Sequence, residues 1–401
     1  MSQLPTSTKA ITLRESPAGR EPRYHDAALE QRAIPSLQKG QVLVKIGAAG
    51  FNHREVWIRK GLYPGLAFGA VFGADGAGTH STNPVLARAS QRARDRRCRG
   101  GHGRPPSEQA SIPGPHAWLE EPPRCTRVTV GAQYQTSSAE LKLATSSKFV
   151  ILGGGKVVPL GTFAEYVAVD RDQVVLTPDH LNDVQAAAWP LGGLTAWRAS
   201  VVNAHVEKGD NVLITGIGGG VALLAMQICL ARGANVYVSS GSEDKISQAV
   251  SLGAKAGVNY KSDEWPTQLE KQLQQNSPEM PILSAVIDSG GGNIMSNVSK
   301  ILKPGGCVVI YGMTGSPAVT FTMREVLKNQ RVIGSTMGSH KDLVDATAFL
   351  AQHRLVPIVS HVLDGLENAE QGFELISKGK QFGKVVIRIK HEDVGASRAL
   401  L

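Results

Sequence analysis

The sequence predicts an α/β protein in which a doubly wound parallel sheet accompanies a second, mostly β module. Strand and helix patterns alternate from about Asp183 onward, which is typical of parallel sheets. Short strands and glycine turns, without a long helix, precede Gly78. The chain has 401 residues, of which 44 are glycine and 5% are aromatic. This length suits two domains of ordinary size.

Short strands define the first module. Residues 9–13 (KAITL) and 41–46 (QVLVKI) have strand composition. Residues 79–148 are instead rich in Arg, Ser, Pro, Ala and Gly, and strand patterning resumes at Phe149 and at residues 161–169. A long stretch without secondary structure is unusual inside a compact domain. Residues 79–148 therefore interrupt the module.

The second part alternates strands with helices. Strands are predicted at residues 211–215, 235–240, 285–288, 307–311 and 384–389, and helices at 184–202, 221–231, 243–252 and 343–353. Residues 364–367 (DGLE) have a capping-box pattern and predict the start of another helix. Four glycines divide the uncharged stretch 211–231 into a strand and a helix, which argues against a membrane span.

The net charge of +9 is local, because nine arginines, no lysine and four acidic residues lie between His80 and Val130. The four cysteines include no CxxC pair, so a cysteine-rich zinc lobe and a dense disulfide framework are both excluded. Cys229 and Cys307 are predicted to be small core residues. Because the N-terminus also lacks the apolar core of a signal peptide, we expect a reducing, cytoplasmic setting.

A glycine-rich turn supplies the first functional signal. Gly216, Gly219, Gly220 and Val221 follow a predicted strand and open a predicted helix. Glycine lets the backbone approach a pyrophosphate closely, and the helix N-terminus favours negative charge. The context predicts a dinucleotide site, against the alternative of a turn without a ligand.

The end of the next strand distinguishes two cofactors. NAD sites usually carry an acid there, which binds the ribose 2′-hydroxyl. Here Ser239 and Ser240 end the strand and Lys245 follows, a set that suits a 2′-phosphate. Glu243 and Asp244 could face the same region or cap the next helix, and Lys245 could be a solvated surface residue. NADPH is favoured over NADH.

Nine stretches together resemble the medium-chain dehydrogenase/reductase superfamily, most closely its zinc-free quinone oxidoreductase-like and alcohol dehydrogenase-like branch. They are NHRE (52–55), KGLYP (60–64), GADGAG (73–78), GTFAEYV (161–167), PLGGLTAW (190–197), the turn at 216–222, NY (259–260), LKPGG (302–306) and GKVVI (383–387). Their order covers most of residues 9–79 and 149–390. As a set they are specific, whereas each alone is weak.

The resemblance implies a GroES-like catalytic β domain split between residues 1–180 and 341–401, around a Rossmann domain at 181–340. It implies NAD(P)H-dependent reduction of quinones, enones or related carbonyls, often by a homodimer. The positions it carries over are Gly216, Gly219, Gly220 and Val221 at the pyrophosphate, Ser240, Lys245 and Tyr260 at the 2′-phosphate, and Thr195, Gly312, Met313 and Lys384 beside the nicotinamide.

The same resemblance argues against zinc. Zinc-dependent relatives place a cysteine where this chain has Asn52, and a His-Glu pair where it has Ala74 and Asp75. Zinc needs three or four converging ligands. His53 and Glu55 could supply two of them, and no third lies at a sensible spacing, so no metal ligand is predicted.

Hydrogen-bond donors must then stabilise the oxygen that becomes negative as hydride is transferred. By motif position, the candidates are Asn52 (an amide donor) and Tyr63 (a hydroxyl donor and candidate proton source), with Thr195 beside them. His53 and Arg54 are alternatives, and Tyr63 could instead be a wall of the pocket. Asp75 is expected to hold backbone in a glycine-rich turn.

Three interpretations compete for the arginine-rich run Arg88–Arg104, which holds seven arginines and one aspartate. It could be a basic disordered loop or a nucleic-acid-binding arm, although no aromatic residue lies within it to stack on bases. We favour a translation artefact such as a retained intron, because the resemblance stops abruptly and resumes in register. Abundant native peptides from residues 100–145 would contradict that hypothesis.

The sequence therefore predicts an NADPH-dependent quinone or enone reductase that works without metal. The alternatives are a pathway-specific enoyl reductase of secondary metabolism and a catalytically silent nucleotide-binding protein with a basic RNA-binding loop. Turnover of a simple quinone would argue against the last.

Overall fold

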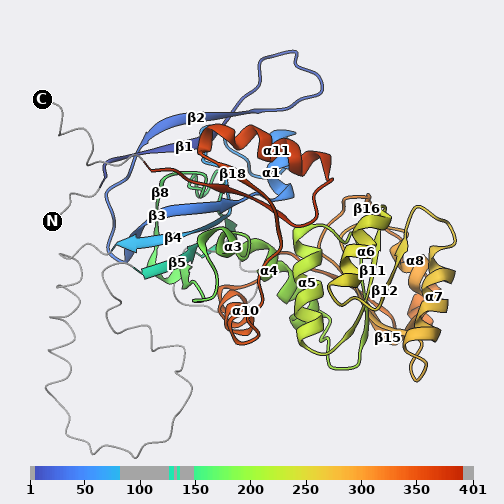
Figure 1. Ribbon diagram of the computed structural model, residues 1–401. Helices are drawn as coiled ribbons and strands as arrows, with labels where there is room; N and C mark the ends of the chain where they lie inside the picture. The colour runs from blue at the N-terminus through green and yellow to red at the C-terminus, as the bar shows by residue number, and fades with distance from the viewer. Residues whose placement is uncertain (1–4, 82–125, 131–132, 136–148, 392–401) are drawn as a thin grey trace, which may run out of the picture.

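The computed structural model describes residues 5–81, 126–130, 133–135 and 149–391. These residues form two lobes, one around a mixed β-sheet and one around a parallel sheet, with helices α4 (Pro190–Trp197) and α5 (Gly220–Ala231) where the lobes meet (Figure 1). The arginine-rich run Arg88–Arg104 and the hypothesis attached to it lie outside the described residues.

The second lobe is built on a six-stranded sheet in which every neighbouring pair is parallel. Across the sheet the strands are β12 (Ala256–Asn259), β11 (Asn235–Ser240), β10 (Asn211–Ile214), β13 (Leu283–Asp288), β15 (Leu302–Ile310) and β17 (Arg331–Gly334). The order reverses between β10 and β13, and ligands bind at such switch points, outside the carboxyl ends of the strands. The predicted doubly wound sheet is confirmed.

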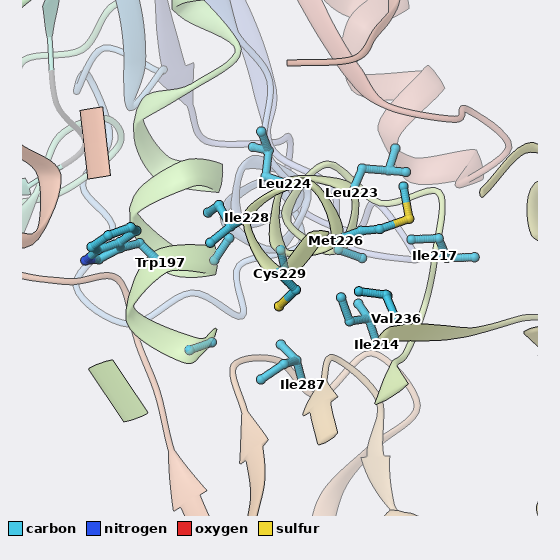
Figure 2. Packing of buried hydrophobic residues seen from close by; sticks show 14 of the residues in the cluster. Trp197, Ile214, Ile217, Leu223, Leu224, Met226, Ile228, Cys229, Val236 and Ile287 are labelled. Carbon is cyan, nitrogen blue, oxygen red and sulfur yellow. The ribbon is translucent and has the colours of Figure 1, made fainter. Parts of the chain in front are cut away.

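Apolar packing on both faces explains why the strands of this sheet are parallel and buried. All four residues of β10 and all six of β13 are buried. Figure 2 shows α5 packed on the sheet, with Met226 and Cys229 on the side of the helix toward Ile214, Val236 and Ile287 of the strands. The opposite face is covered by α7 (Trp265–Asn276) and α8 (Ile294–Val298).

Cys229 and Cys307 are buried core residues, as predicted. Cys229 lies on the inner side of α5, where burial raises the pKa of its thiol to about 12. The thiol therefore stays protonated and packs as a small apolar group.

The first lobe contains a mixed sheet made from both ends of the chain. Its order is β18 (Val359–Asp364), β19 (Lys384–Arg388), β3 (Gln41–Gly50), β4 (Asp75–Ser81), β5 (Thr126–Val130) and β9 (Val174–Leu176), and β8 (Tyr166–Asp170) also pairs with β3. β19 lies antiparallel to β3, so the last strand of the chain pairs with a strand from its N-terminal part. β5 lies within residues 79–148, which the sequence analysis treated as an interruption of this module. Part of that stretch therefore belongs to the sheet.

The remaining elements belong to one lobe or the other. β1 (Ser7–Arg14) pairs with β2 (Asp26–Ala33), α1 (His53–Arg59) packs against α11 (Ala369–Lys378), and β6 (Gln133–Gln135) pairs with β7 (Phe149–Ile151). Helix α6 (Glu243–Ser251) belongs to the parallel lobe, and α10 (His340–Gln352) packs on α4. In the part of the chain that the structure describes, no helix has the length and apolar character needed to cross a membrane.

Two sequence expectations are corrected. The helix predicted at residues 184–202 consists of α3 (Asp183–Ala187), α4 and a π-helical turn (Arg198–Asn203), because Pro190 starts a new helix at its first turn. The capping box at residues 364–367 does not form. Asp364 ends β18 and pairs with Arg388 at 2.7 Å, and α11 begins at Ala369 without a side-chain cap.

Candidate active site

The glycine-rich turn lies at the carboxyl end of β10, where the strand order reverses. Gly216 and Gly218 have φ values of 66° and 109°, which favour glycine. The amide of Ile217 donates to the carbonyl of Ser239 at 2.9 Å, and this bond ties the turn to β11. Gly219 caps α5 without a side chain, so the first amides of the helix remain available to an anion. These residues fit a dinucleotide pyrophosphate.

Three predicted residues for the ribose 2′-phosphate separate into two places. Ser240 is buried at the end of β11, and the amide of Tyr260 donates to its carbonyl at 3.1 Å. A Cβ atom on Gly241 would lie 2.8 Å from Tyr260 Oη and 2.8 Å from Lys261 Cε. Ser240, Tyr260 and Lys261 are therefore neighbours beyond β11, and Lys261 is a cation that the sequence analysis did not include.

Lys245 lies elsewhere, across the glycine turn. Its Nζ donates to the carbonyl of Gly379 at 2.9 Å, and its Cδ lies 2.6 Å from where a Cβ atom on Gly218 would be. Glu243, which could have repelled a 2′-phosphate, accepts from the Asn259 side chain at 2.8 Å.

A buried polar cluster lies beside the turn and centres on Lys384. Lys384 Nζ donates to Asn52 Oδ1 at 2.6 Å and to Asp75 Oδ2 at 3.0 Å, and Asn52 Nδ2 donates to the same Asp75 oxygen at 2.9 Å. The second oxygen of Asp75 accepts from the amide of Leu191 at 2.7 Å. Asp75 is fully buried and Lys384 is 4% exposed. Asp75 was expected to hold the backbone of its own glycine-rich turn; it instead holds the backbone at the start of α4, and it also pairs with the lysine.

Lys384 connects this cluster to the cofactor turn. It is the first residue of β19, and a Cβ atom on Gly220 would lie 2.5 Å from its Cδ. The amide of Gly383 donates to the carbonyl of Gly218 at 2.9 Å. The start of β19 is thus fixed against the glycine turn and the start of α5, and the alkyl chain of the lysine packs against the second lobe.

Glu55 and Arg54 form the second half of the cluster. Glu55 is fully buried and accepts from the amide of Asn52 at 2.7 Å. Burial raises the pKa of Glu55 to about 7, with nearby Asp75 adding to the rise and Arg54 and Lys384 opposing it. Arg54 donates to the carbonyls of Leu152 and Gly153 at 2.9 and 2.8 Å, and so holds that loop in place.

The other predicted residues differ in how far they are exposed to solvent. Tyr63 is half-buried, with the Arg54 guanidinium 4.8 Å from its ring centre. Thr195 is buried, and its hydroxyl donates to the sulfur of Met337 at 3.8 Å. Gly312 and Met313 follow β15 and line a hollow of about 310 Å³, in which Met313 is 62% exposed.

The donor set does not fit a catalytic zinc ion. Among the described residues, no group of three or more His, Cys, Asp or Glu side chains could hold a metal. Asp75, the carboxylate at the relevant position, already bonds to an ammonium group, which repels a divalent cation. Burial and nearby Lys60 lower the pKa of His53, and its ring lies edge-on to Trp57.

Comparison with known proteins agrees with this fold. A protein-family model described as "Zinc-binding dehydrogenase" matches residues 220–352. The chain is 36% identical over 389 residues to "Zinc-type alcohol dehydrogenase-like protein YogA" of Leptosphaeria maculans, covering 94% of this chain and 99% of the relative. The chain belongs to the medium-chain dehydrogenase/reductase superfamily.

Other superfamily members agree with this assignment. A zinc-type alcohol dehydrogenase-like protein of Schizosaccharomyces pombe is 27% identical, over 90% of this chain and 94% of its own length. The crystal structure of an NAD-dependent alcohol dehydrogenase superposes with a TM-score of 0.74 at 29% identity, covering 95% of this chain and all of that one. This medium-chain dehydrogenase/reductase is therefore an NAD(P)-dependent oxidoreductase with an α/β fold.

Sequence reasoning missed two features of the site. The first is Lys261, although its place directly after Tyr260 was a usable signal. The second is the Lys384–Asp75 pair, which joins residues 309 positions apart. No local pattern indicates a contact across such a distance.

Proposed function

We propose that this superfamily member is an NADPH-dependent reductase that transfers hydride to a quinone or an α,β-unsaturated carbonyl compound without a metal ion. The observation that carries the proposal is the Lys384–Asp75–Asn52 cluster. Where zinc-dependent relatives hold their metal, this chain has an amide, an alanine and a carboxylate bonded to a lysine. A fixed cation is thus present without a metal ligand set.

The turn and its flanks supply the cofactor site. Gly219, Gly220 and Val221 offer helix amides to the pyrophosphate, and Gly312 and Met313 line the hollow on the nicotinamide side. When bound, the nicotinamide supplies the hydride. Thr195 on α4 and Lys384 on β19 are the residues that we place beside the nicotinamide.

Preference for NADPH over NADH is supported at the end of β11. No acidic residue ends this strand, and Ser240, Tyr260 and Lys261 offer two hydroxyls and a cation. The nearest acid in the following helix, Glu243, is held by Asn259. This set complements a 2′-phosphate and lacks the carboxylate that a 2′-hydroxyl would require.

A titration of the purified full chain with NADPH, followed by nicotinamide fluorescence, tests the proposal when NADH is run in parallel. We expect saturable binding that favours NADPH, and NADPH oxidation on addition of a simple quinone or enone. Oxidation of a primary alcohol with NAD⁺ as the preferred cofactor, without reduction of quinones or enones, would contradict it. Failure to bind either dinucleotide would contradict it as well.

A further inference from the structure

We infer that Lys384 is a catalytic residue whose ammonium group donates a hydrogen bond to the oxygen of the substrate that becomes negative during reduction. This inference rests on the proposed function and adds a chemical role to a residue that the resemblance places only near the nicotinamide. Asn52 and Asp75, which were expected to bind substrate and to hold backbone, become the positioning residues of this lysine.

The hydrogen-bond inventory of the cluster supports the assignment. A lysine ammonium carries three N–H donors. Two of them point to Asn52 Oδ1 and Asp75 Oδ2, and the third has no acceptor among the residues that the structure describes. Because the ammonium is tetrahedral, two fixed bonds set the direction of the third.

Asn52 is less well placed for this task than the sequence indicates. Its carboxamide oxygen accepts from Lys384, and its Nδ2 donates to Asp75 at 2.9 Å and lies 3.5 Å from the carbonyl of Gly50. The amide is therefore already used within the protein, and it fixes Lys384 rather than a substrate.

The position and charge of Lys384 also suit the role. Its alkyl chain crosses Gly220 at the start of α5, so its ammonium lies between the cofactor turn and the first lobe. Lys384 is 4% exposed. A charge that is buried away from water interacts strongly with an anion, because the local dielectric constant is low. Asp75, itself held by the Leu191 amide, pairs with the ammonium group and fixes its position.

The chemistry balances without a metal. Hydride addition to the β-carbon of an enone moves an electron pair onto its carbonyl oxygen and gives an enolate, and hydride addition to one oxygen of a quinone moves an electron pair onto the other oxygen and gives a phenolate; the nicotinamide is oxidised in both cases. The ammonium stabilises that anion by hydrogen bonding, and a proton from water completes the reduced product. The lysine needs no net change of protonation.

The test combines kinetics with a probe of anion binding. Lys384→Met keeps the side-chain length and removes the charge, and Lys271→Met, at an exposed position of α7, is the matched control. The first readout is kcat for quinone reduction. The second is the absorption spectrum of bound 4-nitrophenol, which distinguishes phenolate from phenol and needs no turnover. NADPH fluorescence in the same samples reports the cofactor site.

We expect Lys384→Met to lower kcat about 100- to 1000-fold, the usual effect of removing one oxyanion donor, and to lose the phenolate spectrum that wild type and Lys271→Met display. If Lys384→Met does not fold because Asp75 is left unpaired, Asp75→Asn is compared with Asp75→Asn/Lys384→Met, and only the double variant should lose the phenolate spectrum. Unchanged kcat and phenolate binding in a folded variant lacking Lys384 would overturn the inference alone. A wild-type chain that binds NADPH and reduces neither quinones nor enones would overturn the proposed function and this inference together.

Discussion

Replacing Glu55 with glutamine should remove a defined part of the pH dependence of stability. The native carboxyl is fully buried, and its pKa rises from an ordinary 4.5 to about 7. Between these values the native state keeps a proton that the unfolded chain has lost. Native Glu55 therefore contributes most stability below pH 4.5, and this contribution is lost as the pH rises toward 7. From pH 5 to pH 8 the loss amounts to about 2–3 kcal/mol in the free energy of unfolding.

Chemical denaturation of wild type and Glu55→Gln at pH 5, 6, 7 and 8, followed by tryptophan fluorescence, measures this loss. The glutamine can still accept the amide hydrogen of Asn52, so the first turn of α1 is preserved. We expect the free energy of unfolding of wild type, minus that of Glu55→Gln, to fall by about 2–3 kcal/mol across this range. Glu279→Gln, which removes an exposed carboxylate, is the control. A difference that stays constant within about 0.5 kcal/mol, or rises with pH, would refute a buried Glu55 that is protonated at low pH.

Two further predictions concern the cofactor and assembly. Lys261→Met should weaken NADPH binding about three- to tenfold, because it removes an exposed cation from the 2′-phosphate, while NADH binding stays unchanged. Equal weakening of NADPH and NADH binding in the fluorescence titration would contradict a contact between Lys261 and the 2′-phosphate. The homodimer proposed from the resemblance would use edge strand β17 and helix α9 (Met323–Leu327), where Leu327 is 78% and Met323 64% exposed. Leu327→Asp should weaken dimerisation about tenfold or more in analytical ultracentrifugation. The control is Val157→Asp, at a similarly exposed apolar residue of the first lobe, which should leave dimerisation unchanged. An unchanged association constant for Leu327→Asp would exclude this surface as the dimer interface.

The fold was predictable from the sequence because its signals are local. A strand, a glycine turn and a helix follow one another at residues 211–231, and the structure confirms each of them. The break in the helix predicted at 184–202 also had a local signal in Pro190, which is favoured in a first turn and disfavoured inside a helix. Residues 364–367 match the capping-box pattern, but no capping box forms, because Gly365 adopts a φ of 85° and Asp364 forms an ion pair with Arg388.

The site was predictable only in part, because its chemistry depends on contacts between distant segments. Motif position brought Asn52 and Lys384 to the same region, and the structure places them 2.6 Å apart. The use of the Asn52 amide by Asp75 and Lys384, and the direction of Lys245 toward Gly379, follow from how the two lobes meet. Spacing in the sequence does not encode either contact.

The most direct measurement is NADPH oxidation by the full chain with a quinone or enone, after exhaustive chelation and with zinc content determined on the same sample. We predict that the rate survives metal removal and does not increase when Zn²⁺ is restored, because Lys384 supplies the positive charge at the site. A rate that disappears on chelation and returns with stoichiometric Zn²⁺ would contradict this account.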